Sequence, residues 1–163
     1  MAEINVIRNT YGGMEYLHNA LGYVSDERSL CRGGYGVDPY DSNRAYEQML
    51  ATHRYFGKVS GNPLVHVIIA YDKSVTDLST AAQNGFLCAR YFAYKYQVLY
   101  CTHEKDTSCG SFHTHLIINA VSYVNGQMIS TGFKEMNDFC SYVTQITGQK
   151  SWFYFDNKAN YNG

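Results

Sequence analysis

The segment 112–119 places two histidines inside a short apolar run, a pattern typical of a buried β-strand. Side chains at positions i and i+2 of a strand project from the same face, so His113 and His115 are expected to share one face of a sheet. A third histidine, His103, ends the preceding apolar run at 97–102. If these two runs pair as neighbouring strands, three imidazoles converge, as in catalytic metal sites with open coordination positions. A packed pair of hydrogen-bonded histidines would give the same short pattern, so the prediction depends on the fold.

Composition places the chain among ordinary globular proteins. Its 163 residues, 45% of them hydrophobic and 17% charged, are enough for one domain with a real core. A net charge of −1 gives no general basic surface, so any affinity for DNA must come from a local patch or a metal. The sixteen tyrosines suit base stacking, but they also suit a tyrosine-rich core.

Cysteine usage and the hydropathy pattern indicate a cellular compartment. The five cysteines are odd in number and form no C-x-x-C motif, which favours free thiols in a reducing cytoplasm. The N-terminus has no apolar signal core, and no apolar run is long enough to span a membrane. We therefore expect a cytoplasmic protein with no membrane contact.

Periodicity predicts an alternation of helices and strands. Helices are expected at 14–24, 42–57, 77–94 and 133–148, and strands at 5–8, 64–71, 97–103, 112–124 and 127–131. The glycine-rich stretch 25–36 is expected to be a loop, and Ser42 is expected to cap the second helix. Asn125-Gly126 indicates a type I′ hairpin, and the aromatic tail from Trp152 suits either an edge strand or the stub of a longer protein.

This order of elements predicts an α+β fold. We expect a largely antiparallel sheet of about five strands with helices packed on one face. The histidines would then lie on the open face of the sheet.

The histidine pattern resembles a motif of relaxases, the HUH-type mobilisation nucleases of conjugative plasmids and integrative elements, and this resemblance implies an HUH-endonuclease-like fold. His103, His113 and His115, followed by Asn119 on the same run, are similar to the histidine motif of the MobA-type, or MOBP, class. The segment 19–24 is similar to the motif that carries the nucleophilic tyrosine, here Tyr23, and 64–69 resembles the family's middle motif, which contains His66. Together these motifs cover most of residues 14–132 in the family's order.

Two features depart from the family's pattern. The gap between the first histidine and the pair is longer than usual, and Lys105 stands where an aspartate is often found. Glu104 and Asp106 flank this position, so the identity of a carboxylate helper stays open. Because full relaxases usually continue into further domains, residues 1–163 are expected to be a single relaxase domain from the N-terminal part of a longer protein.

The resemblance implies a function and a set of site residues. It implies a metal-dependent DNA relaxase that nicks one strand of single-stranded transfer-origin DNA through a covalent 5′-phosphotyrosyl intermediate, for conjugative mobilisation in the bacterial cytoplasm. Mn²⁺ or Mg²⁺ would be held by the three histidines, although nitrogen ligands alone also suit Zn²⁺, Co²⁺ or Ni²⁺. Besides origin DNA, other transfer proteins of the relaxosome are implied as partners. Tyr23 is the expected nucleophile, with Tyr11 and Tyr16 as alternatives, and residues expected to support the metal or contact DNA are Glu104, Asn119, His66, Arg28 and Arg32.

Two other readings stay open. Rolling-circle replication initiators and transposases use the same paired histidines but place the tyrosine after them, often as Tyr-x-x-Lys. The nearest match here is Tyr142-Val-Thr-Gln145, which has glutamine in place of the lysine. The third reading is a tyrosine-rich nucleic-acid-binding module without catalytic activity, whose histidines are structural.

Overall fold

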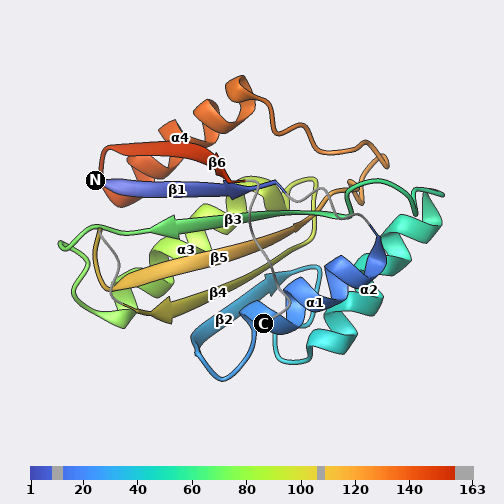
Figure 1. Ribbon diagram of the computed structural model, residues 1–163, viewed down its shortest axis with the longest axis horizontal. Coiled ribbons are helices and arrows are strands. Elements are labelled where there is room, and N and C mark those ends of the chain that lie inside the picture. The colour runs from blue at the N-terminus through green and yellow to red at the C-terminus, as the bar shows by residue number, and fades with distance from the viewer. Residues whose placement is uncertain (9–12, 106–108, 157–163) are drawn as a thin grey trace.

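The computed structural model describes residues 1–8, 13–105 and 109–156, which form a six-stranded sheet and four helices (Figure 1). In chain order the elements are β1 (Ala2–Ile7), α1 (Met14–Val24), β2 (Ser29–Tyr35), α2 (Ser42–Tyr55), β3 (Leu64–Ala70), α3 (Leu78–Ala93), β4 (Val98–Glu104), β5 (Phe112–Asn119), α4 (Phe133–Thr147) and β6 (Ser151–Asp156). The strands lie in the order β2-β4-β5-β3-β1-β6. All neighbouring pairs are antiparallel except β1 and β6, which run parallel.

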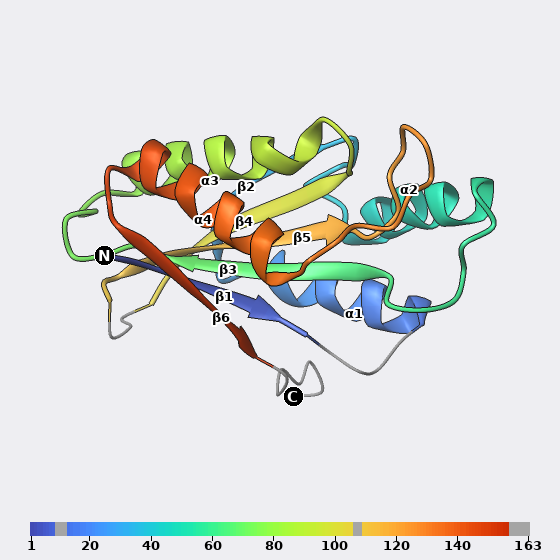
Figure 2. The same ribbon diagram turned by 90° about the horizontal axis from the view of Figure 1, so that it is seen from above.

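Helices cover both faces of this sheet (Figure 2). On one face, α3 and α4 pack over a large apolar cluster that includes Val67, Leu116 and Phe139. On the other face, α1 packs over Leu99 and Ile117, and α2 packs against α1. The prediction of a mixed α+β fold with a mainly antiparallel sheet is confirmed, whereas the expected five strands and single helical face are corrected to six strands and two helical faces.

Two strands account for the difference in strand number. Residues 29–35, expected to be loop, form the edge strand β2, which pairs with β4. The aromatic tail forms the opposite edge strand, β6. The strand expected at 127–131 is only an isolated bridge between Val121 and Met128.

Helix ends and turns follow the sequence closely, with two corrections. Helix α2 is capped by Asp41 rather than Ser42, because the Asp41 carboxylate accepts a hydrogen bond from the backbone N–H of Arg44. Gly148 ends α4 in the left-handed conformation, with φ of 70°. Gly126 also has a positive φ, but Asn125 does not, so the turn is not the type I′ hairpin that the sequence predicted.

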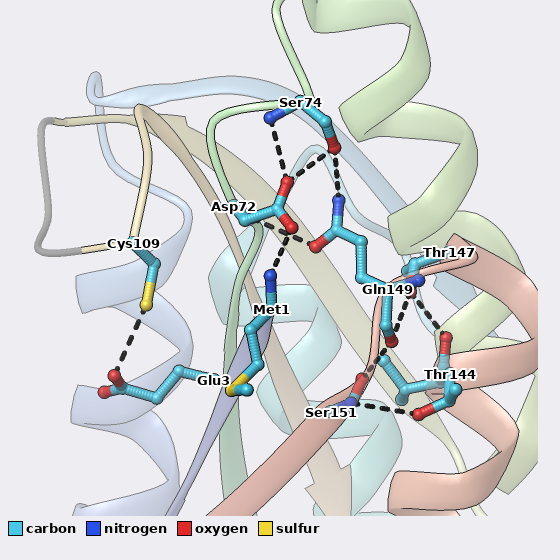
Figure 3. A network of polar contacts seen from close by, with 10 residues as sticks. Met1, Glu3, Asp72, Ser74, Cys109, Thr144, Thr147, Gln149 and Ser151 are labelled. Carbon is cyan, nitrogen blue, oxygen red and sulfur yellow. Dashed lines mark hydrogen bonds and ion pairs between the residues drawn. The ribbon is translucent and has the colours of Figure 1, made fainter.

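A network of polar contacts ties the start of β1 to the segments that follow β3 and precede β6 (Figure 3). The amino group of Met1 forms an ion pair with the Asp72 carboxylate, just after β3. Gln149 lies just before β6. Its side chain accepts a hydrogen bond from the backbone N–H of Asp72 and donates one to the Ser74 hydroxyl. The segments before β1, after β3 and before β6 are thereby joined at the end of the sheet where β5 begins. None of the four helices in the described parts of the chain has the length and apolar character of a membrane span.

Candidate active site

Strand register brings the three predicted metal ligands together. His103 on β4 lies directly opposite His113 on β5, and His115 lies two residues further along the same face. The ring centroids of His103 and His115 are 4.6 Å apart, and those of His113 and His115 are 5.0 Å apart. One ring nitrogen from each histidine can be chosen so that all three lie within 4.8 Å of one another. The three side chains therefore form one cluster able to hold a metal ion.

Hydrogen bonds to the protein determine which nitrogens remain for a ligand. The Nε2 of His103 lies 2.8 Å from the carbonyl oxygen of Val24. A carbonyl oxygen can only accept, so Nε2 carries the proton and Nδ1 keeps its lone pair. The Nδ1 of His115 shares a 2.8 Å hydrogen bond with Nε2 of His66, which leaves the Nε2 of His115 for a ligand. Among the described residues, nothing hydrogen-bonds the buried Nδ1 of His113. This donor set fits a divalent metal ion.

Burial keeps these imidazoles neutral at physiological pH. Loss of solvation, together with the smaller effect of charge on His103, lowers the pKa of His113 to about 4 and that of His66 to about 3. The same loss of solvation lowers the pKa of His115 well below its usual value, and that of His103 also falls. Because a metal binds the neutral imidazole, the site needs little proton release before it can bind a cation.

The predicted nucleophile, Tyr23, lies beside the cluster on the last turn of α1. Its ring contacts the edge of the His115 ring, with centroids 6.5 Å apart at 83°, and the residue is 37% exposed. The Arg28 guanidinium lies 4.6 Å over the centre of the Tyr23 ring and donates to the Tyr23 carbonyl. The Asp26 carboxylate holds Arg28, because both of its oxygens accept from the Arg28 Nε–H at 3.0 Å. A phenol and a cation thus lie at the edge of the buried histidine cluster.

The alternative tyrosines are placed differently. Tyr16 is 7% exposed and packs in the core beneath α1. Tyr11 lies outside the described residues. Tyr142, the tyrosine of the replication-initiator reading, lies on α4 across the sheet from the histidines, and its hydroxyl donates to the Leu87 carbonyl. Among the candidate tyrosines that the structure describes, Tyr23 is the one that lies beside the histidines.

The remaining predicted site residues divide into two groups. His66 contacts His115 directly, Arg28 contacts Tyr23, and Arg32 lies on the histidine face of β2, opposite Cys101. Glu104 is exposed but follows His103 by one residue, so it projects from the opposite face and does not support the cluster.

The prediction for Asn119 is also wrong. Asn119 has no exposed surface, and its amide donates to the Met49 carbonyl and to the Gln97 side chain. It therefore fastens α2 to the sheet and is not available to DNA.

Sequence reasoning missed a hollow beside the histidines. It is lined by His113 and His115 together with Glu3 and Asn5 of β1 and Tyr154 of β6. Strand alternation could have placed Glu3 and Asn5 on one face, but the sequence carried no sign that β1 lies next to β3. Asp26 was missed as the partner of Arg28, although the two are only two residues apart.

Comparisons with known proteins agree with this fold and indicate its family. A solved structure from work on the "Molecular Basis of Vancomycin Resistance Transfer in Staphylococcus aureus" is similar to this chain with a TM-score of 0.62 and 9% sequence identity, over 90% of each chain. At that identity the likeness shows the fold alone. A comparison with curated proteins gave no match. The model of the relaxase family, described as "MobA/VirD2-like, nuclease domain", matches residues 16–152, and the chain therefore belongs to this family of relaxases.

Proposed function

We propose that this relaxase domain is a site- and strand-specific nuclease and strand transferase for single-stranded transfer-origin DNA. One observation carries the proposal: Tyr23 and three neutral histidines with nitrogens free to bind a metal meet at one partly open corner. Origin DNA would be its partner in conjugative mobilisation, together with other transfer proteins, in the bacterial cytoplasm. Residues 1–163 would form a single relaxase domain.

The chain's own residues suit attack on a phosphodiester. The Tyr23 oxygen would attack phosphorus, the bond from phosphorus to the 3′-oxygen would break, and a 5′-phosphotyrosyl link would form. The phenol loses its proton and the leaving 3′-oxygen gains one, so the strand ends in a free 3′-hydroxyl. Because the phosphotyrosyl link keeps the bond energy, the strand can later be rejoined.

Arg28 and Arg32 would hold the phosphate backbone. Arg28 is fixed over the Tyr23 ring by Asp26, with its guanidinium 4.6 Å from the ring centre, so its charge already lies close to the phenol. Arg32 lies on the same face, two strands from His115. A planar guanidinium can bind two phosphate oxygens at once, which suits this role.

A divalent ion, Mn²⁺ or Mg²⁺, would be held by His103, His113 and His115. When bound, it would polarise the phosphate and offset the negative charge that develops in the transition state. His103 also ties the cluster to α1 through the Val24 carbonyl, next to the nucleophile.

The nucleophile can be tested by covalent trapping. Single-stranded DNA carrying the element's transfer origin is incubated with protein and Mn²⁺, and the products are separated under denaturing conditions. Wild-type protein should give a protein–DNA adduct, and Tyr23→Phe should give none while still binding the DNA. Tyr55→Phe is the matched control, because Tyr55 is 83% exposed on α2 and should leave the adduct unchanged. An adduct formed by Tyr23→Phe at the wild-type level would refute the assignment, and Tyr16→Phe and Tyr11→Phe would then be examined.

Metal dependence is tested in the same assay. EDTA should abolish the adduct and added Mn²⁺ should restore it, since the histidines are expected to act through the ion. His113→Ala should lose both the adduct and Mn²⁺ binding, because it removes one of three ligands. A full yield of adduct in EDTA would contradict the metal's role and leave the tyrosine assignment intact.

A further inference from the structure

The hollow beside the histidines is built from a row of residues that crosses four strands. Tyr154 on β6 pairs with Asn5 on β1, Asn5 pairs with Ile68 on β3, and Ile68 pairs with His115 on β5. Neighbouring strands are about 4.8 Å apart, so Asn5 lies about 10 Å from His115 along this row. The hollow has a volume of about 240 Å³, somewhat below the roughly 300–1,000 Å³ of pockets for drug-sized ligands. Its size suits one planar ring system.

The charges of the hollow suit a nucleobase rather than a phosphate. Its described lining includes the Glu3 carboxylate and one cationic side chain, Lys105. A carboxylate repels a phosphate, but it can accept hydrogen bonds from the N–H groups of a base. Lys105 can donate to a base carbonyl beside it.

Glu3 is held in place by two donors. The Cys109 thiol donates to Oε2 of Glu3 at 3.4 Å (Figure 3). Burial and the Glu3 carboxylate raise the pKa of Tyr154 to about 12, so the Tyr154 phenol stays protonated as a second donor. An ionised carboxylate has about four acceptor positions, which leaves two for a ligand.

The Tyr154 ring lines the hollow, and the Trp152 ring lies beside it. The rings of Tyr154 and Trp152 lie side by side on the same face of β6, with centroids 5.5 Å apart at 31°. Trp152 is 43% exposed, and its partner in the strand register is Glu3. Stacking on such rings is a general way to hold an unpaired base.

We propose that this hollow binds a single guanine base of the DNA strand, close to the phosphate held at the histidines. The inference rests on the proposed function for the presence of that strand. Guanine is the base whose Watson–Crick edge carries two adjacent N–H donors, N1–H and the N2 amino group, and these match the two oxygens of Glu3. Its O6 carbonyl lies next to them and suits Lys105. Adenine and cytosine each place an acceptor beside their amino group, so a carboxylate would meet one lone pair.

A binding selection tests the proposal without relying on cleavage. A pool of random single-stranded DNA is bound to the full chain in EDTA, and the retained molecules are sequenced. Wild-type protein should enrich a guanine at one fixed position of the recovered motif. Glu3→Gln should change that position to adenine, because an amide offers one donor and one acceptor. Glu47→Gln, on the exposed side of α2, is the matched control and should keep guanine.

A change in the DNA alone gives a second measurement. Inosine lacks the N2 amino group, so replacing that guanine by inosine should weaken binding of the wild-type protein about tenfold, the effect expected when half of a paired contact is lost. This measurement stands even if Glu3→Gln fails to fold.

The outcomes separate the two proposals. No fixed guanine, a guanine unaffected by Glu3→Gln, or equal binding of inosine would each overturn the base site. A selected guanine without any covalent adduct in Mn²⁺ would overturn the proposed nuclease function and leave the base site standing. An adduct without a selected guanine would overturn the base site and leave the proposed nuclease function standing.

Discussion

A hydrogen bond between two imidazoles, His66 and His115, determines which nitrogen of His115 faces the other metal ligands. His66 is 1% exposed and lies on β3, next to the strand that carries His115. If Nε2 of His115 binds the metal, its Nδ1 carries the proton and donates to His66. His66 is therefore inferred to be a positioning residue that does not touch the metal itself.

This role predicts a difference between two substitutions. His66→Phe should lower Mn²⁺ affinity about 10- to 100-fold, because His115 loses the acceptor that fixes its orientation. His66→Gln should keep most of the affinity, since the glutamine oxygen can accept the same proton. Calorimetric titration with Mn²⁺ measures both, and thermal unfolding without metal separates general damage to the fold. Equal losses in the two variants would argue for a purely structural His66.

At the level of helices and strands, Gly85 allows α3 to lie close to the sheet behind the histidines. A Cβ at this position would lie 3.0 Å from the side chain of Thr114 and 3.3 Å from the hydroxyl of Thr102. Thr114 cannot easily move, because its hydroxyl is hydrogen-bonded to both Tyr71 and Thr102. Tyr71, Thr102 and Thr114 form a buried polar layer across the sheet from the three histidines.

The two helical glycines should therefore respond in opposite ways. Gly85→Leu should destabilise the fold by about 1–3 kcal/mol, because a larger side chain would force α3 away from Thr114. Gly22→Ala in α1 should stabilise it by up to about 1 kcal/mol, since nothing lies within 4 Å of the added carbon and alanine favours the helix. Chemical denaturation of the metal-free protein measures both. A stabilising Gly85→Leu would mean that α3 is free to shift.

The elements differ in how well they could be predicted. Helix α1 was predicted at its observed bounds, because its apolar residues recur at helical spacing. Strand β2 was missed because Gly33 and Gly34 interrupt any alternation of apolar and polar residues. A carbon on Gly33 would collide with the Tyr100 ring, so the glycine is explained by a residue that lies on another strand.

Across the whole molecule, the buried histidines link stability to pH. His66 and His113 have pKa values of about 3 and 4 when folded, against an ordinary value of 6.5. Between pH 6.5 and 4 the unfolded chain therefore binds protons that the folded chain does not, and stability falls as the pH falls. Each such histidine contributes a slope of about 1.4 kcal/mol per pH unit.

Urea unfolding in EDTA, measured between pH 7.5 and 5, tests this linkage before most carboxylates titrate. Stability should be flat above pH 7 and decline below 6.5. His113→Asn should reduce the slope by about 1.4 kcal/mol per pH unit, because one buried imidazole is removed. The same slope in wild type and variant would show that His113 is protonated in the folded protein.

The sequence by itself determined the secondary structure of most of the chain and the shared face of His113 and His115. Both follow from local geometry, because the periods of helix and strand act over a few residues. The tertiary structure alone decided that β1 lies between β3 and β6, which brings Asn5 within 3.4 Å of Asp156 across 151 residues of chain. It also decided that Asn119 is buried under α2 and that a hollow adjoins the histidines. Strand order depends on how distant segments bury their apolar faces together, and no short-range pattern records that choice.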